Sequence, residues 1–244
     1  MTSKDDPVAG YELRSFGRKR GRKPSPRQAQ LVEEVLPRVA VDLSAPFSQL
    51  SYSPAPSGRL PEWEPEGADK RLFLEIGFGG AEHLIWQAMN NPGVMLIGCE
   101  PFLDGAVKAL SAIDEHGLNN IRLHADDARP LLRWLPPASL DRVFILFPDP
   151  WPKKKHVKRR LVSKPMLDLL ARVMKPGAEL RIGTDIGDYA RTLLLAFQQT
   201  PGFVWTATAP SDWRERPADW PPTRYEAKAI REGRRRYFLT FVRT

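Results

Sequence analysis

From Arg71 onward, short apolar runs alternate with segments of helical periodicity, and this alternation limits the folds that the chain can adopt. Seven of the runs are rich in β-forming residues, and five of these, which show little polar alternation, resemble strands buried on both faces of a parallel sheet. The seven runs are 71–76, 94–99, 121–125, 141–147, 179–184, 203–207 and 235–243. Helical segments fall at 82–91, 102–116, 129–135, 166–175 and 188–199. The pattern predicts an α/β fold with an open, doubly wound sheet of seven strands, mostly parallel, with helices on both faces.

The turn after the first predicted strand is a candidate binding site, because ligands of open α/β sheets bind at the carboxyl ends of the strands. Gly77, Gly79 and Gly80 are typical of a tight turn that lets a ligand approach the backbone. A dinucleotide-binding turn would have a small residue in place of Glu82, and Glu75 beside the turn would repel a pyrophosphate. The acid favours a cationic ligand, and S-adenosylmethionine meets that condition.

Acidic residues also follow the next three predicted strands. Glu100 follows the second, where a carboxylate can accept hydrogen bonds from both ribose hydroxyls of either NAD or S-adenosylmethionine. Asp126 or Asp127, after the third, could accept from an adenine amino group, and Asp149 follows the fourth between two prolines. Each acid alone has a simpler interpretation as a helix cap or turn residue. Acids at successive strand ends favour a shared binding site.

Positive charge is concentrated in two segments of the chain. Arg14–Arg27 holds seven Lys or Arg residues and Lys153–Arg160 holds six, with no acid in either. The rest of the chain has 24 basic and 29 acidic residues, although the whole chain carries a net charge of +8. Basic segments on an acidic body predict a polyanionic partner, nucleic acid before an anionic membrane. If the second run were only a solvated helix face, its positive charges would repel one another, because no acid within the run compensates them.

The chain is expected to divide into a basic, partly flexible N-terminal arm at 1–50 and one domain at 51–244, joined by the Pro-rich stretch Tyr52–Gly67. Cys99 is the only cysteine, and neither a signal-peptide core nor a membrane-spanning run is present. We therefore expect a soluble, cytoplasmic protein without membrane contact. The four histidines show no metal-ligand spacing, so no metal is expected.

Six segments, in family order from about Arg14 to Phe241, resemble the tRNA (guanine-N7)-methyltransferase family. They are RSFGRKRGR, LEIGFGG, IGCEPF, FPDPWPKKKHVKRRL, GTDIGDYA and TRYEAKAIREGRRRYFLTF. The FPDPW block with its basic run and the terminal TRYE are specific to the family, whereas the glycine turn is not. The resemblance implies a Rossmann-like class I methyltransferase fold for 51–244 that uses S-adenosylmethionine as its cofactor. It also implies tRNA as the partner, N7 of the variable-loop guanine as the methyl acceptor, and no obligatory protein partner.

The same resemblance implies roles for individual residues. Asp149 is expected to be catalytic. The implied cofactor-binding residues are Glu75, Gly77, Gly79, Glu100, Asp127 and Asp149. The implied substrate-binding residues are Lys153, Asp185, Thr223, Arg224, Tyr225 and Glu226. Asp127 is preferred over Asp126 because Ala128 follows it, as in the family, and Ala81 stands where many relatives have glycine.

The expected methyl transfer requires from the protein mainly the orientation of the two reactants and electrostatic stabilisation of the transition state. Guanine N7 has a free lone pair, so displacement on a sulfonium methyl group needs no general base. Asp149, Asp185 or Glu226 could hold the guanine N1 and N2 hydrogens, and the sequence does not choose between them. Trp213 and Trp220 could stack on a base or anchor their loop.

Two other functions remain open at this stage. A nicotinamide-dependent oxidoreductase is disfavoured by Glu75 and by the missing third glycine. A non-catalytic RNA-binding protein is disfavoured by the acids at the strand ends, for which phosphate binding gives no reason.

Overall fold

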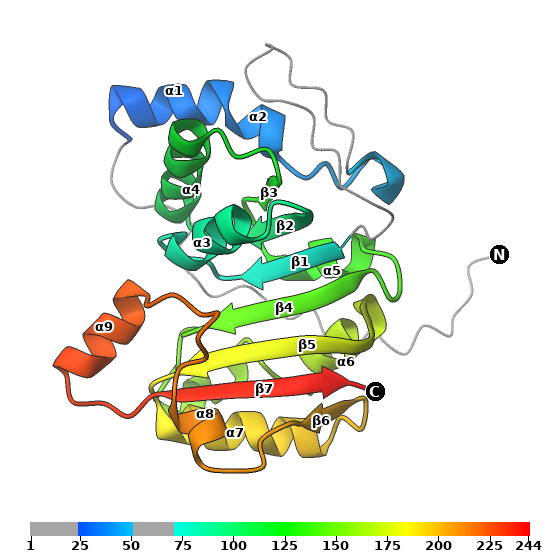
Figure 1. Ribbon diagram of the computed structural model, residues 1–244, viewed down its shortest axis with the longest axis vertical. Coiled ribbons are helices and arrows are strands. Elements are labelled where there is room, and N and C mark those ends of the chain that lie inside the picture. The colour runs from blue at the N-terminus through cyan, green and yellow to red at the C-terminus, as the bar shows by residue number, and fades with distance from the viewer. Residues whose placement is uncertain (1–23, 51–70) are drawn as a thin grey trace.

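The computed structural model describes residues 24–50 and 71–244. Within them, seven strands form one sheet in the order β3-β2-β1-β4-β5-β7-β6, with β1 to β5 parallel and β7 antiparallel to both of its neighbours (Figure 1). The strands are β1 (Arg71–Ile76), β2 (Val94–Cys99), β3 (Ile121–His124), β4 (Leu140–Leu146), β5 (Met174–Thr184), β6 (Phe203–Trp205) and β7 (Tyr237–Arg243). The predicted sheet of seven mostly parallel strands is confirmed.

Helices cover both faces of the sheet, and each face has its own apolar core. On one face lie α1 (Pro26–Glu34), α2 (Leu36–Val39), α3 (Glu82–Asn90) and α4 (Leu103–His116). On the other lie α5 (Ala128–Trp134), α6 (Lys164–Val173) and α7 (Gly187–Gln198). The remaining elements are η1 (Phe47–Gln49), η2 (Lys154–Arg159), α8 (Ser211–Arg214) and α9 (Arg224–Arg231).

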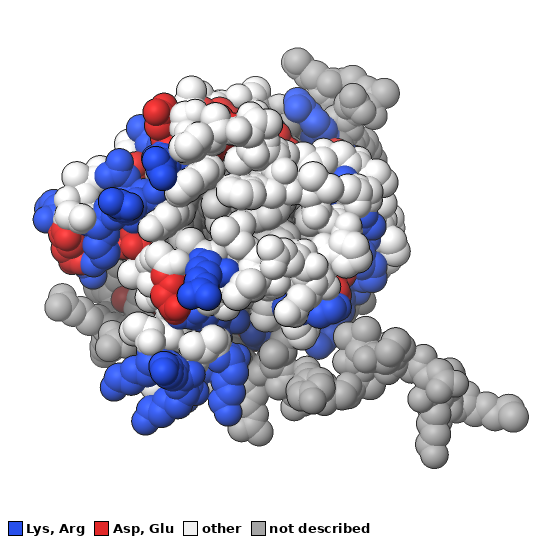
Figure 2. Space-filling model, turned by 90° about the horizontal axis from the view of Figure 1, so that it is seen from below, with Lys and Arg blue, Asp and Glu red and all other residues white. Residues whose placement is uncertain are grey.

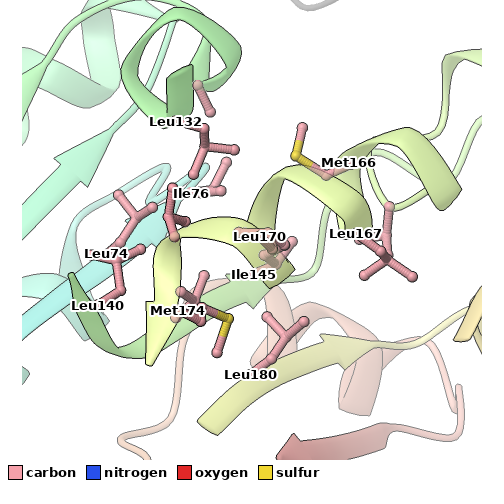
Figure 3. Close-up of a cluster of buried hydrophobic side chains, with 14 of the residues drawn as sticks. Leu74, Ile76, Leu132, Leu140, Ile145, Met166, Leu167, Leu170, Met174 and Leu180 are labelled. Atoms are coloured by element: carbon pink, nitrogen blue, oxygen red, sulfur yellow. The ribbon is translucent and has the colours of Figure 1, made fainter. Parts of the chain in front are cut away.

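Alternation along the central strands divides their side chains between the two cores. Leu74 and Ile76 of β1 belong to the core under α5 and α6, whereas Phe73 belongs to the core under α3 and α4. Figure 3 shows Leu74 and Ile76 beside Leu132 of α5, and Ile145 of β4 beside Leu170 of α6. The strands therefore read as continuous apolar runs because both of their faces are covered.

The N-terminal helices belong to the body of the molecule. Ser25 and Gln28 form a capping box that starts α1, and Leu31, Val35 and Val39 repeat at a spacing of four residues and are buried. The domain division at residue 50 stays a prediction, but residues 25–39 of the predicted arm pack on α4 and β3. Residues 1–23 and 51–70, with most of the first basic segment and the Pro-rich stretch, lie outside the described residues.

One predicted helix ends earlier than expected. The sequence pattern predicts a helix over 166–175, but α6 ends at Val173 and β5 begins at Met174, which pairs with Leu140. The pairing shifts between Leu140 and Arg142, which accommodates the residues before Glu179. No helix among the described residues has the length and apolar character needed to cross a membrane.

Candidate active site

A cavity of about 600 Å³ opens at the carboxyl ends of β1, β2 and β4. Its walls come from the glycine turn, from the residues that follow β2, β3 and β4, and from the start of α9. The lining residues are Ile76, Gly77, Gly79, Cys99, Glu100, Pro101, Phe102, Asp127, Ala128, Arg129, Phe147, Pro148, Asp149, Trp151, Arg159, Leu161, Arg224 and Tyr225.

The glycine turn and Glu100 form one unit. Gly77 and Gly79 adopt left-handed backbone conformations, with φ of 77° and 55°. Glu100 Oε2 accepts a hydrogen bond from the Gly79 backbone N–H at 2.9 Å, and Oε1 accepts from the Phe102 N–H at 3.0 Å. Ala81 is also left-handed, with φ 68°. The turn therefore keeps a glycine-like shape at this position.

Burial dominates the electrostatics of Glu100. Its pKa is raised above the usual value, mainly because burial disfavours the charged form, while the two backbone N–H groups act in the opposite direction. The nearby Asp149 raises the pKa further, and Arg224 lowers it. Glu100 thus titrates closer to neutral pH than an exposed carboxylate.

Asp127 combines a capping role with a place in the cavity wall. It is the N-cap of α5, and its Oδ1 accepts from the Arg129 backbone N–H at 2.9 Å. Its Oδ2 accepts from Arg129 Nη1 at 2.6 Å. Asp126 does not line the cavity, and its carbonyl accepts a hydrogen bond from the Cys99 thiol. The capping interpretation of Asp127 is therefore correct, and the residue also faces the cavity.

Asp149 lies in a constrained turn that follows β4. Phe147 and Trp151, on either side of Pro148-Asp149-Pro150, have φ of 50° and 41°, which is uncommon for residues other than glycine. Within residues 24–50 and 71–244, no hydrogen bond or ion pair engages the exposed Asp149 carboxylate. The turn presents an available carboxylate in the wall of the cavity.

The start of α9 closes the cavity above the glycine turn. Thr223 caps the helix, and its Oγ1 accepts from the Glu226 N–H at 3.2 Å. Arg224 stacks on Tyr225, with its guanidinium carbon 4.9 Å from the centre of the ring. A methyl group at Gly79 would lie 2.9 Å from the Tyr225 ring, so the glycine allows this close approach.

Four of the predicted site residues lie outside the cavity wall. Lys153 is exposed at the start of η2, and Thr223 is buried as the cap of α9. Asp185 Oδ2 pairs with Arg234 Nε at 2.6 Å. Glu226, 5 % exposed, lies between Arg216 at 3.3 Å and Arg236 at 3.8 Å.

Glu75 also lies outside the cavity wall, although the family resemblance implies a cofactor contact for it. It is 2 % exposed on the α3 side of β1, and its Oε2 lies 2.8 Å from His83 Nδ1. Phe73, two residues earlier, faces the same side. The period of two along a strand is the signal that separates Glu75 from the cavity-lining Ile76.

A buried polar chain that the sequence did not predict starts at Glu75. Gln87 Nε2 can only donate, so His83 Nε2, 3.2 Å away, accepts and His83 Nδ1 donates to Glu75. Gln87 Nε2 also donates to the Asp219 carbonyl at 3.0 Å. Trp220, 2 % exposed, packs on Phe238, so the loop-anchoring interpretation of this tryptophan is correct. The chain connects β1 to the loop that leads into α9.

Exposed basic side chains gather on two segments that also contribute residues to the cavity wall, η2 and α9. In Figure 2, blue atoms form two groups at the left, the side to which β1, β4 and β5 point in Figure 1. The exposed basic residues of η2 and its N-cap are Lys153, Lys154, Lys155 and Lys158. Those of α9 and the residues after it are Arg224, Lys228, Arg231 and Arg235.

Comparison of the sequence with known proteins shows the family of this chain. Residues 69–239 match a family described as a putative methyltransferase. The tRNA (guanine-N(7)-)-methyltransferase of Mesorhizobium japonicum is 48 % identical over 243 residues, covering 100 % of both chains. The protein of the same name from Rhodospirillum rubrum is 44 % identical, covering 95 % of this chain and 88 % of its own.

Among solved structures, an antibiotic-related methyltransferase matches with a TM-score of 0.51 at 17 % identity, covering 72 % of this chain and 88 % of its own. That likeness supports the Rossmann-like methyltransferase fold predicted from the sequence. The sequence matches, extending over the whole chain, identify the protein as a member of the tRNA (guanine-N7)-methyltransferase family.

Proposed function

We propose that this protein methylates N7 of a guanine in tRNA and takes the methyl group from S-adenosylmethionine. One structural observation carries the proposal. The segment that presents Asp149 and Trp151 to the cavity continues directly into the exposed lysines of η2. A polyanion held by those lysines would bring a base to the mouth of an acidic cavity.

The cavity suits a cationic nucleoside cofactor of this size. A volume of about 600 Å³ lies within the usual range for ligand pockets. Glu100 is placed to accept hydrogen bonds from ribose hydroxyls, and Asp127 keeps free lone pairs for an adenine amino group. Asp149 would face the ammonium and sulfonium end. Since Glu75 is bonded to His83 behind the turn, we propose no direct contact for it.

S-adenosylmethionine supplies an electrophilic methyl group. The residues of this chain have to orient guanine N7 in line with it and exclude competing nucleophiles. Since N7 carries its own lone pair, no side chain has to remove a proton from the acceptor atom. The methylated base is cationic, so the Asp149 carboxylate at the cavity wall stabilises the charge that develops.

We also propose that the target is the variable-loop guanine.

Asp149 is the acid best placed near the reacting groups, because Asp185 and Glu226 are each paired with arginine. Those two acids would have to share or exchange their arginine partners to hold the guanine N1 and N2 hydrogens. The cytoplasmic location and the absence of an obligatory protein partner remain predictions.

Transfer of labelled methyl to unmodified bulk tRNA, followed by nuclease digestion and nucleoside mass spectrometry, tests the proposal. We expect 7-methylguanosine, and we expect it to disappear from a transcript whose variable-loop guanine is replaced by adenine. Asp149→Ala should lower turnover far more than tRNA affinity.

The outcomes separate the competing functions. Label in another nucleoside would overturn the chemistry assigned to the site, and label that survives the guanine replacement would overturn the target position. Binding of NADH without binding of S-adenosylmethionine would favour an oxidoreductase. Binding of tRNA with no methyl transfer would favour a non-catalytic RNA-binding protein.

A further inference from the structure

Arg160 ends the basic run but differs from its other members. Lys153, Lys154, Lys155 and Lys158 are exposed and Arg159 is partly exposed, whereas Arg160 is only 4 % exposed. A buried guanidinium cannot reach a phosphate without giving up its partners inside the protein. Arg160 therefore needs an explanation other than RNA binding.

The guanidinium of Arg160 connects the Asp149 turn to α7. Its Nε donates to the Pro150 carbonyl at 2.9 Å, directly after Asp149. On the other side, Nη1 donates to Thr192 Oγ1 and Nη2 to Asp188 Oδ2. All three nitrogens of the planar group are thus directed at partners that lie on two different segments.

The Arg160 guanidinium stacks on the ring of Tyr189. The Arg160 guanidinium carbon is 5.0 Å from the centre of the Tyr189 ring. Tyr189 is fully buried, and its hydroxyl accepts from the Val162 N–H at 3.2 Å. Burial raises the pKa of Tyr189 to about 12, so the ring stays neutral at all working pH values. This stacking contact fixes the position of the guanidinium over α7.

The Asp149 turn needs such an anchor. Phe147 and Trp151 hold left-handed backbone conformations, which persist only where the surroundings fix them. At the β4 side, the Phe147 N–H donates to the Gly183 carbonyl at 2.7 Å. At the η2 side, Arg160 holds the Pro150 carbonyl. Asp149 lies between these two attachment points.

We propose that Arg160 is a positioning residue for methyl transfer, holding the Asp149 turn against α7 instead of binding tRNA phosphate. The inference rests on the proposed role of Asp149. It separates the basic run into exposed lysines that contact RNA and a buried arginine that fixes the geometry of the site. Lysine cannot replace it, because an ammonium group lacks the planar fork that reaches both segments.

The test compares Arg160→Gln and Arg160→Lys with Asp188→Asn, which weakens the anchor while leaving the arginine in place. Arg191→Gln serves as the matched control, because this exposed arginine lies on α7 beside the anchor. Lys158→Gln removes one charge from the same run. For each variant, kcat at saturating tRNA, the dissociation constant for S-adenosylmethionine, Tm, and the salt dependence of tRNA binding are measured.

We expect Arg160→Gln and Arg160→Lys to lower kcat at least tenfold, and Asp188→Asn to lower it less, with the salt slope unchanged. Lys158→Gln should reduce the salt slope by roughly one. Arg191→Gln should change neither quantity. Should Arg160→Gln fail to fold, Arg160→Lys and Asp188→Asn decide the question.

A phosphate-binding role would give the opposite result, namely a reduced salt slope in Arg160→Gln with kcat at saturation retained. A merely structural role would lower Tm and cofactor affinity together without a specific loss of kcat. Either result would overturn the inference. Asp149→Ala, assayed in parallel, separates the role of Asp149 from the positioning role of Arg160. Unchanged turnover in that variant would mean that the role assigned to Asp149 is wrong. Lower turnover in Asp149→Ala, together with full activity in the Arg160 variants, would overturn only the positioning role of Arg160.

Discussion

At the scale of single residues, Glu100 makes cofactor binding sensitive to pH. Its raised pKa, caused mainly by burial, means that the carboxylate becomes protonated at a higher pH than an exposed glutamate does. We expect the affinity for S-adenosylmethionine to fall as the pH is lowered through this range, because a protonated Glu100 loses acceptor capacity. Calorimetric titration of the cofactor at a series of pH values measures the effect.

Stability should respond to the same proton with the opposite sign. Because the folded state raises the pKa of Glu100, it binds the proton more tightly than the unfolded chain does. The contribution of Glu100 to folding therefore grows as the pH falls, and weaker cofactor binding is not a sign of unfolding. Glu100→Gln is the control, and an equal pH dependence of cofactor affinity in that variant would remove Glu100 as the cause.

Several residues of the site could be predicted from where the strands end. Gly77, Gly79, Glu100, Asp127 and Asp149 follow apolar runs, and the structure brings all five to one cavity. Long-range partners left no such signal. The pairing of Asp185 with Arg234 joins positions 49 residues apart, and such contacts depend on the packing of α9 and β7.

At the scale of elements, the strands were predictable and the peripheral helices were not. The starts and ends of β1 and β2 coincide with the predicted runs, because buried parallel strands are uniformly apolar. In α9, with the sequence RYEAKAIR, the helix is amphipathic but half of its residues are charged, so it lacks the apolar content that marks the other helices. The Thr-x-x-Glu pattern at Thr223 and Glu226 is a capping signal that could have located its start.

Gln87 should hold the loop before α9 in place. Gln87→Leu would leave the buried His83 Nε2 and the partly buried Asp219 carbonyl without their donor, which costs about 1–3 kcal/mol. We also expect a higher KM for tRNA, because Trp220 and the start of α9 would lose their anchor. Urea unfolding and steady-state kinetics measure the two effects.

Asn90→Leu is the matched control for that change, since Asn90 is exposed on the same helix. A substitution at such a surface position normally shifts stability by less than about 0.5 kcal/mol. If both leucine variants lose the same free energy of unfolding, the buried polar chain does not stabilise the loop.

At the scale of the whole molecule, the exposed lysines of η2 lie on the side where the cavity opens. Replacement of Lys154, Lys155 and Lys158 by glutamine should weaken tRNA binding and flatten its salt dependence. The logarithmic slope should fall by roughly one for each phosphate that the protein no longer neutralises. Binding measured from low to physiological salt gives the slope.

A second triple variant with the same reduction in charge provides the control. Lys108, Arg133 and Arg71 are exposed and lie outside η2 and α9. Their replacement by glutamine should leave the salt slope close to that of the unmodified protein. Equal slopes in the two triple variants would mean that overall charge, and not the η2 surface, attracts the RNA.

The position of β7 in the sheet has a consequence for how the protein is made. β7 lies between β5 and β6, and β6 pairs with β7 and with no other strand among the described residues. During synthesis, β6 leaves the ribosome before β7, so β6 cannot pair until β7 has been added. The edge of the sheet beyond β5 is therefore completed last, after the strands that are followed by Glu100, Asp127 and Asp149 have been made.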